Sequence, residues 1–256
     1  MDTDITYEQP LNERVRTFLR MEHLFKLVDH HIKGASEWDS RGTLSILLDI
    51  INLLSRSDIK TELIKELERH STTLAALEQN PGVDCQRLHI ILKEINEYLT
   101  LLRDNSCQPG IALRDDELIS SIKQRTAIPG GGCNFDLPNY YHWLHKPTID
   151  KNRDFEKWQN DLLIIKKSVK LSLDMIRNST NPSIEKAEKG FFQKPIESNV
   201  ACQMIRIIVP ANSIYFPEIS GGKHRFTVRF MEQSSTAVRP SQTNDEVQFQ
   251  LNCCIL

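Results

Sequence analysis

The chain has 256 residues and a nearly balanced charge, with 32 basic and 34 acidic residues for a net charge of -2. A chain of this length can bury a full hydrophobic core, as one large domain or two smaller ones, without disulfides or metals to hold it together. The balanced charge excludes a protein that coats nucleic acid through its overall field, so recognition of an acidic partner must use a local patch.

The cysteine pattern and the first residues indicate the compartment. Six cysteines are scattered without C-x-x-C spacing, and the start MDTDITYEQP has no basic-then-apolar signal segment. The most apolar run, ILLDIINLL at 46–54, is too short to span a bilayer. We therefore expect a cytoplasmic protein with free thiols and no membrane insertion.

From Pro10 to about residue 180, apolar residues recur at helical spacing. Asp58 is a natural helix N-cap, and the NPG turn at 80–82 separates two helices. The pattern predicts about seven helices, beginning near residue 11 and continuing at about 41–55, 58–78, 84–104, 114–125, 138–145 and 150–177.

After NSTNPS at 178–183 the pattern changes to short β-rich segments separated by Gly, Pro, Asn and Ser. We therefore predict an α+β fold, with an N-terminal multi-helix domain over 1–182 followed by a small antiparallel β domain over 183–256. A short strand near 133–137, inside the helical half, could join the β domain.

The segment IPGGGCNFDLPNYYHWLH at 128–145 has residue types found in active sites. A phosphate loop would need a G-K-[ST] sequence that is absent, and zinc would need four ligands where Cys133, His142 and His145 offer three. A Cys133–His142 nucleophile pair lacks an identifiable acid or oxyanion donor.

We interpret the segment as a structural joint. Its glycines would supply positive φ while Phe135, Tyr140 and Trp143 pack between domains. No catalytic residue, metal or cofactor is expected.

The C-terminal sequence CCIL fits a prenylation signal, but the alternation before it favours a different interpretation. Every second residue of this stretch is apolar or a cysteine, namely Val247, Phe249, Leu251 and Cys253. This period of two predicts a closing β-strand with these side chains on one face.

The stretch GGKHRFTVRFM at 221–231 predicts a strand with two different faces. One face carries Phe226, Val228 and Phe230, and the other carries Lys223, Arg225 and Arg229. A solvated outer face is one interpretation, and a binding site for an acidic or carboxylate-bearing peptide is the other. A weaker candidate is the group Arg14, Arg16 and Arg20 on the first helix, where neighbouring acids partly neutralise the charge.

Several segments, in order and over nearly the whole chain, resemble the ZapD family of bacterial cell division proteins. They are YEQPLNERVRTFLR, RSDIKTELIKELER, NPGVD, IPGGGCNFDLPNYYHWLH, YFPEISGGKHRFTVRFM and LNCC. The resemblance implies a non-enzymatic, cytoplasmic homodimer recruited to the midcell division ring. It would bind the C-terminal tail of FtsZ and cross-link FtsZ filaments. On the family pattern the tail-binding residues are Lys223, Arg225 and Arg229, with Arg20 and Arg56 as secondary matches.

Two other functions remain open from the residues alone. One is a hydrolase centred on Cys133 and His142, and the other is a nucleic-acid-binding module that uses the arginines of the basic strand. Thiol alkylation would abolish the first activity. The second is disfavoured by the net charge of -2, since a single short basic stripe should bind DNA only weakly at physiological salt.

Overall fold

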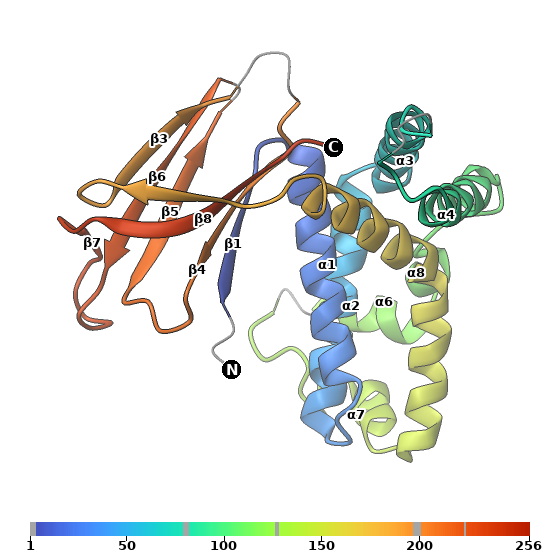
Figure 1. Cartoon of the computed structure of the whole chain (residues 1–256). Helices are drawn as coiled ribbons and strands as arrows, with labels where there is room; N and C mark the ends of the chain where they lie inside the picture. The colour runs from blue at the N-terminus through green and yellow to red at the C-terminus, as the bar shows by residue number, and fades with distance from the viewer. Residues whose placement is uncertain (1–3, 79–81, 126–127, 197–200, 223) are drawn as a thin grey trace. The chain divides into compact units, whose positions relative to one another are not determined.

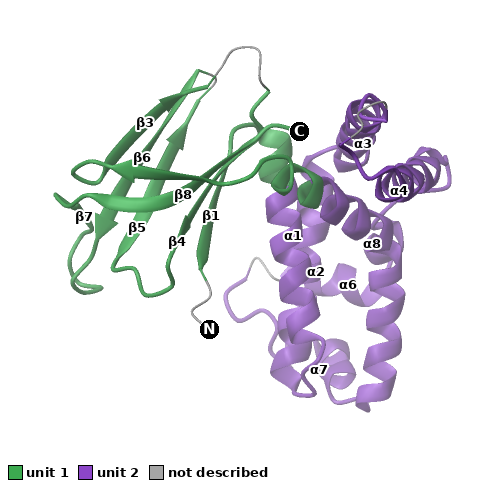
Figure 2. Ribbon diagram, in the orientation of Figure 1, with its two compact units in different colours: residues 1–17, 173–256 green, residues 18–172 purple. Residues whose placement is uncertain are grey.

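The computed structural model describes residues 4–78, 82–125, 128–196, 201–222 and 224–256. The chain forms two compact units, one of residues 1–17 and 173–256 and the other of residues 18–172 (Figure 2). The first unit contains the strands and the second contains most of the helices, which confirms the predicted α+β class.

Helices make up residues 18–172 together with short connections (Figure 1). The long helices α1 (Glu13–His31) and α8 (Thr148–Arg177) each extend across the division between the units in the sequence. The other helices are α2 (Glu37–Arg56), α3 (Ile59–Ala75), α4 (Cys85–Arg103), α5 (Ile111–Arg114), α6 (Glu117–Arg125) and α7 (Pro138–Leu144).

Side-chain caps determine where several helices begin. At α2 the Ser36 hydroxyl accepts the Asp39 backbone N–H at 3.1 Å, while the Asp39 carboxylate accepts the Ser36 N–H at 3.1 Å. This capping box satisfies two N–H groups at the helix start. It explains why α2 begins at Glu37, earlier than the hydrophobic period predicts. Asp58 caps α3 as expected, by accepting the Thr61 N–H at 3.1 Å.

Apolar side chains of α2 and α8 contribute to the core of the helical unit. The run at 46–54 lies inside α2, where Leu47 and Ile51 are each 1% exposed. Trp143 and Trp158 both pack edge-on against Phe155, with ring centroids 5.4 and 5.7 Å away. Within the described residues, no helix combines the length and the apolar character needed to cross a membrane.

The β unit contains two antiparallel sheets. The first has the order β1–β4–β8–β2, with β1 (Ile5–Pro10), β4 (Met204–Val209), β8 (Val247–Cys254) and β2 (Ser183–Ala187). The second has the order β3–β6–β5, with β3 (Phe191–Pro195), β6 (Arg225–Glu232) and β5 (Tyr215–Gly221), and the short β7 (Ser241–Gln242) pairs with the end of β6.

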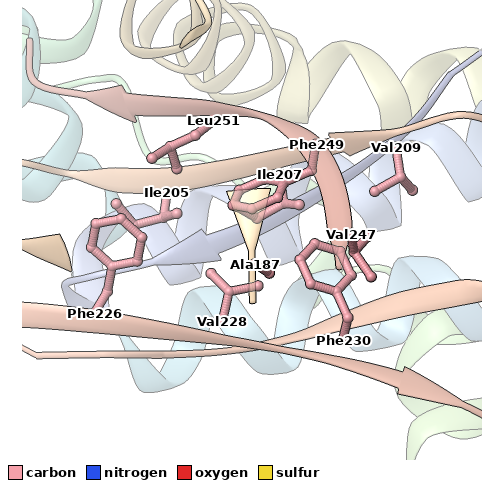
Figure 3. Close-up of a cluster of buried hydrophobic side chains, with 10 residues drawn as sticks. All are labelled: Ala187, Ile205, Ile207, Val209, Phe226, Val228, Phe230, Val247, Phe249 and Leu251. Atoms are coloured by element: carbon pink, nitrogen blue, oxygen red, sulfur yellow. The ribbon is translucent and has the colours of Figure 1, made fainter. Parts of the chain in front are cut away.

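The inner faces of both sheets share one hydrophobic cluster (Figure 3). Alternate residues of β4, β6 and β8 supply most of it, as expected for strands with one buried face. The cluster consists of Ala187, Ile205, Ile207, Val209, Phe226, Val228, Phe230, Val247, Phe249 and Leu251.

The structure differs from the sequence-based expectation in two places. Residues 5–10, counted with the helical domain, form β1 and pair with β4, where Ile5 lies opposite Val209. The strand expected at 133–137 is wrong, because these residues form turns. The Asp136 and Leu137 N–H groups both bond to the Cys133 carbonyl, at 3.1 and 3.0 Å. Their hydrogen bonds are therefore satisfied locally rather than in a sheet.

Candidate functional site

Strand β6 has the two faces that its sequence predicts. Phe226, Val228 and Phe230 are at most 1% exposed and lie in the hydrophobic cluster. Arg225 and Arg229, on the opposite parity, are exposed. The alternation is thus confirmed for the described part of the strand, and Lys223, the third predicted cation, lies outside the described residues.

The pairing register shows which side chains accompany the arginines. Arg229 lies between Phe191 of β3 and Glu218 of β5, and directly paired residues share one face of a sheet. We call the resulting surface the outer face of the β3–β6–β5 sheet. It comprises Phe191, Gln193 and Pro195 of β3, Arg225, Thr227, Arg229 and Met231 of β6, and Phe216, Glu218 and Ser220 of β5.

Within the described chain, neither Arg225 nor Arg229 forms an ion pair within 4 Å. Glu218 is the cross-strand neighbour of Arg229, whereas Arg225 lies opposite Pro195. Four residues along a strand separate the two arginines by about 13 Å. The outer face therefore presents two guanidinium groups to solvent, with the more positive surroundings at the Arg225 end.

The secondary candidates Arg20 and Arg56 lie in the helical unit rather than the β unit. Arg20 is exposed on α1. Arg56 is the last residue of α2 and lines a shallow hollow of about 370 Å³ together with Lys60 and Arg114. The structure thus divides the predicted tail-binding residues between the two units.

Sequence reasoning missed the two cations that line the hollow with Arg56. Lys60 donates through Nζ to the carbonyls of Asp104 and Cys107, at 3.2 and 2.7 Å. Arg114 donates through Nε to the Gly110 carbonyl at 3.2 Å. Both cations thus bind carbonyl groups of the chain. Only the proximity of Lys60 to Arg56 in the sequence could have indicated part of this group, since Arg114 comes from a distant segment.

In the segment 128–145 the glycines have the backbone role that the sequence suggested. Gly130 has a φ of +74°, a left-handed conformation that side chains disfavour. A Cβ at Gly131 would lie 2.3 Å from the Arg125 carbonyl oxygen, so the backbone approaches too closely for a side chain. The predicted positive φ is confirmed at Gly130 and is wrong at Gly131 and Gly132.

The aromatic residues of this segment differ from the prediction, since the contacts described for Tyr140 and Trp143 lie within the helical unit rather than between domains. Tyr140 and Trp143 are each 4% exposed, with the Arg41 guanidinium 5.0 Å from the Tyr140 ring centre. The Trp143 indole N–H donates to the Asp154 carboxylate at 2.7 Å. Phe135 is 79% exposed, so its predicted packing is wrong. The turns at 133–137 leave the Phe135 ring in solvent. In a paired strand the ring could have packed on a cross-strand neighbour.

The chemically suggestive residues do not converge on one centre. Cys133 and His142 are exposed. His145 donates through Nδ1 to the Tyr141 carbonyl at 2.8 Å, and its Nε2 lies 3.9 Å from the Glu37 carboxylate. Across the described residues, no group of three His, Cys, Asp or Glu side chains is placed to hold a metal ion. The arrangement gives the hydrolase interpretation no geometric support.

These features define a class: an α+β protein of two units, with a small two-sheet β unit whose outer face carries exposed arginines. The family model described as "ZapD: Cell division protein" matches residues 19–229. The chain therefore belongs to the ZapD family of cell division proteins, which confirms the resemblance of its ordered segments and supports a role in cell division.

Three relatives illustrate the extent of the similarity, and each is named cell division protein ZapD. The protein of Methylococcus capsulatus is 40% identical over 256 residues, which cover the whole of both chains. That of Coxiella burnetii is 35% identical over 253 residues, or 98% of each chain. That of Azoarcus sp. is 34% identical over 252 residues, covering 98% of this chain and 100% of the relative.

Proposed function

We propose that this protein is a non-enzymatic cell division factor that binds the C-terminal tail of FtsZ through the outer face of the β3–β6–β5 sheet. As a homodimer it cross-links and bundles FtsZ filaments and so stabilises the midcell division ring. Membership of the ZapD family supports the role in division. The observation that carries the choice of site is the pair of exposed arginines on β6, which form no ion pair within the described chain.

The chemistry of the face suits a peptide that carries carboxylates. Each guanidinium group can donate two parallel N–H bonds to one carboxylate, a geometry that a lysine ammonium cannot provide. Phe191, which is 40% exposed, offers apolar surface beside Arg229. Glu218 repels a carboxylate at the Arg229 end, so we expect the strongest tail carboxylate contact at Arg225.

Bundling depends on the number of binding sites per dimer and of tails per filament, rather than on high affinity at a single face. A homodimer presents two outer faces, and a filament displays many copies of the tail. The second contact of a bound dimer is then governed by effective concentration, so modest affinity for one tail becomes strong retention on filaments. Filament bundling should therefore fall more steeply than single-tail binding when the face is weakened.

Charge reversal tests the site. In titrations with a labelled FtsZ tail peptide, Arg225→Glu and Arg229→Glu should each weaken binding by about 1–3 kcal/mol where the contact excludes water, and less where it stays wet. Arg239→Glu is the matched control, since Arg239 is an exposed arginine outside β6 in the same unit. It changes the net charge equally and should leave binding within about 0.5 kcal/mol of the parent.

Filament sedimentation tests the partner. The protein should increase the pelleting of full-length FtsZ polymers and have no effect on tail-deleted polymers. Added salt should weaken the effect, because screening reduces attraction between exposed charges. Wild-type bundling by a folded Arg225→Glu/Arg229→Glu variant would exclude the β6 site and move the search to Arg20 and Arg56.

A further inference from the structure

Helix α4 has an exposed side as well as the side that packs within the helical unit. Its buried residues are Leu88, Ile95, Leu99 and Leu102. Among the described elements, its main packing partner is α3. Ile90 is 67% exposed and Leu101 is 55% exposed, although both are as apolar as the buried residues. Single exposed apolar residues are common on protein surfaces, so the arrangement of these two decides whether they have a role.

Four exposed residues of α4 lie on one line along the helix. They are Ile90, Lys93, Glu97 and Leu101, and we call them the α4 stripe. They follow one another at intervals of three or four residues, and residues at this spacing lie above one another on a helix. At 1.5 Å per residue the stripe is about 16 Å long. With 3.6 residues per turn, the buried residues lie on the opposite side of α4, so the stripe is a second face of the helix.

The middle of the α4 stripe is charged and borders a concave surface. Lys93 and Glu97 are both exposed, and the Lys93 Nζ atom lies 4.0 Å from the Glu97 carboxylate. A shallow hollow of about 830 Å³ lies beside the stripe. Lys93, Glu97 and Leu101 line it, together with Leu92 and with Glu78 beyond the end of α3. The stripe therefore combines two apolar ends, one cation and one anion at the edge of a hollow.

The order of residues in the stripe is complementary to its own reverse. Ile90 and Leu101 are equally far from the middle of the stripe, and so are Lys93 and Glu97. When two copies meet with their α4 helices antiparallel about a twofold axis, Lys93 of one copy faces Glu97 of the other, and Ile90 faces Leu101. A parallel pair would instead bring together two ammonium groups and two carboxylates, which repel each other.

The net charge of the stripe argues against a strongly charged partner. One cation and one anion give no net attraction to an acidic or a basic surface, whereas an antiparallel copy of the same stripe places opposite charges together at two symmetric points. Its apolar ends would also lose contact with water in that arrangement. Charge complementarity thus favours a second copy of this chain as the occupant.

We propose that the α4 stripe is the contact surface for a second copy of this chain, with the two α4 helices packed antiparallel about a twofold axis. The inference rests on the homodimer of the proposed function and assigns a surface to it. Ile90 and Leu101 pack across the axis, and two Lys93–Glu97 pairs form between the chains. The contact uses no residue of the outer face of the β3–β6–β5 sheet.

Sedimentation equilibrium of the full chain tests the apolar ends of the stripe. Ile90→Glu and Leu101→Glu should each raise the Kd of the dimer about tenfold or more, because the twofold axis places every substituted residue in the contact twice. Ile149→Glu is the matched control, since Ile149 is a 64% exposed isoleucine on α8 in the same unit. It should leave the Kd unchanged. Circular dichroism melts verify that each variant is folded.

Charge exchange tests the antiparallel pairing itself. Lys93→Glu places carboxylates opposite each other across the contact, and Glu97→Lys places ammonium groups opposite each other, so each variant alone should dimerise about tenfold more weakly than the parent. An equimolar mixture of the two variants should recover a dimer with a Kd within about threefold of the parent. In the mixed dimer the two introduced charges face each other with opposite signs, and so do the two native ones. An effect within one chain would not be rescued by mixing.

Three results would overturn the assignment of the stripe. They are a folded Ile90→Glu variant that dimerises as the parent does, a mixture of folded charge variants that fails to recover the dimer, and a parent chain that stays monomeric at every concentration. An Ile90→Glu variant that remains dimeric but no longer bundles FtsZ would also overturn it and assign the stripe to the filament.

The proposed function fails in a different way. A folded, monomeric Ile90→Glu variant that bundles FtsZ as the parent does would support the α4 contact and contradict the role of the dimer in bundling. Titration with the FtsZ tail peptide needs only one chain, so tail binding can fail while the α4 contact stands.

Discussion

The residue types of the segment 128–145 suggest an active site that its side chains do not form. Those of the strand β6 suggest no chemistry, yet its side chains form two distinct faces. The segment contains glycines, a cysteine and two histidines, which are common in active sites, yet Cys133 and His142 are exposed and converge on no common centre. Strand β6 alternates Phe226, Val228 and Phe230 with Arg225, Thr227 and Arg229, and it combines core packing with an exposed cationic face. Residue types become informative only with their spacing and direction.

The physical basis of the difference is geometric. Alternation along a strand fixes the direction of every side chain, so a period of two specifies a face. A run of turns fixes no such relation between neighbours. In the segment 128–145 some contacts come from distant residues, such as Arg41, which donates to the Gly132 carbonyl at 3.1 Å and whose guanidinium lies 5.0 Å from the Tyr140 ring centre.

The largest expected effect is on the buried side of β6. Phe226→Ala and Phe230→Ala should each reduce the free energy of unfolding by about 3–5 kcal/mol, because each removes a ring that is at most 1% exposed and leaves a cavity. Chemical denaturation followed by circular dichroism measures this loss. Arg229→Ala, one residue before Phe230 on the exposed face, is the control and should change stability by less than about 0.5 kcal/mol. Equal losses on both faces would contradict the two-face description.

The next effect concerns the backbone of the segment 128–145. Gly131→Val should cost about 2–3 kcal/mol, because its Cβ would meet the Arg125 carbonyl oxygen at 2.3 Å and force the backbone to move. Gly130→Val should cost about 1–3 kcal/mol, because its φ of +74° strains a branched residue. Gly132→Ala is the milder control, since its Cβ would find its nearest neighbour at 3.4 Å. Thermal melts of all three that match the parent would exclude the backbone role.

A smaller effect is expected at the buried tryptophan of the segment. Trp143→Phe keeps an aromatic ring but removes the N–H that donates to Asp154, so we expect a loss of about 1–2 kcal/mol. A double-mutant cycle with Asp154→Ala separates this bond from the packing of the ring. The double variant should lose less stability than the sum of the losses of the two single variants. Full additivity would mean that the hydrogen bond contributes nothing.

The smallest effects on stability are expected at the cysteine and histidine residues, which are the types common in active sites and metal sites. Cys133→Ser, His142→Ala and His145→Ala should each change stability by less than about 0.5 kcal/mol, because all three side chains are exposed. We expect FtsZ bundling to be retained in all three and bound zinc to be substoichiometric by mass spectrometry. One equivalent of zinc in the purified protein, or loss of bundling in a folded Cys133→Ser variant, would show that these residues have a functional role and would contradict the comparison with β6.

Features that depend on neighbouring residues are predictable from the amino-acid sequence. Hydrophobic periods of 3.6 and two located the main helices, the strands β6 and β8, and the two faces of β6. Asp58 marked the start of α3 because an N-cap bonds to a backbone group three residues away. The sequence also carried the ordered segments that identified the family.

Features that join distant residues depend on the tertiary structure. Strand β1 forms because β4, about two hundred residues later, supplies its hydrogen bonds, and no local period reveals such a partner. The hollow around Arg56 also needs Arg114, which comes from a distant segment of the chain. At 133–137 the predicted strand does not form, because a short segment forms a strand only where a neighbouring strand pairs with it. The Asp136 and Leu137 N–H groups bond to the Cys133 carbonyl instead.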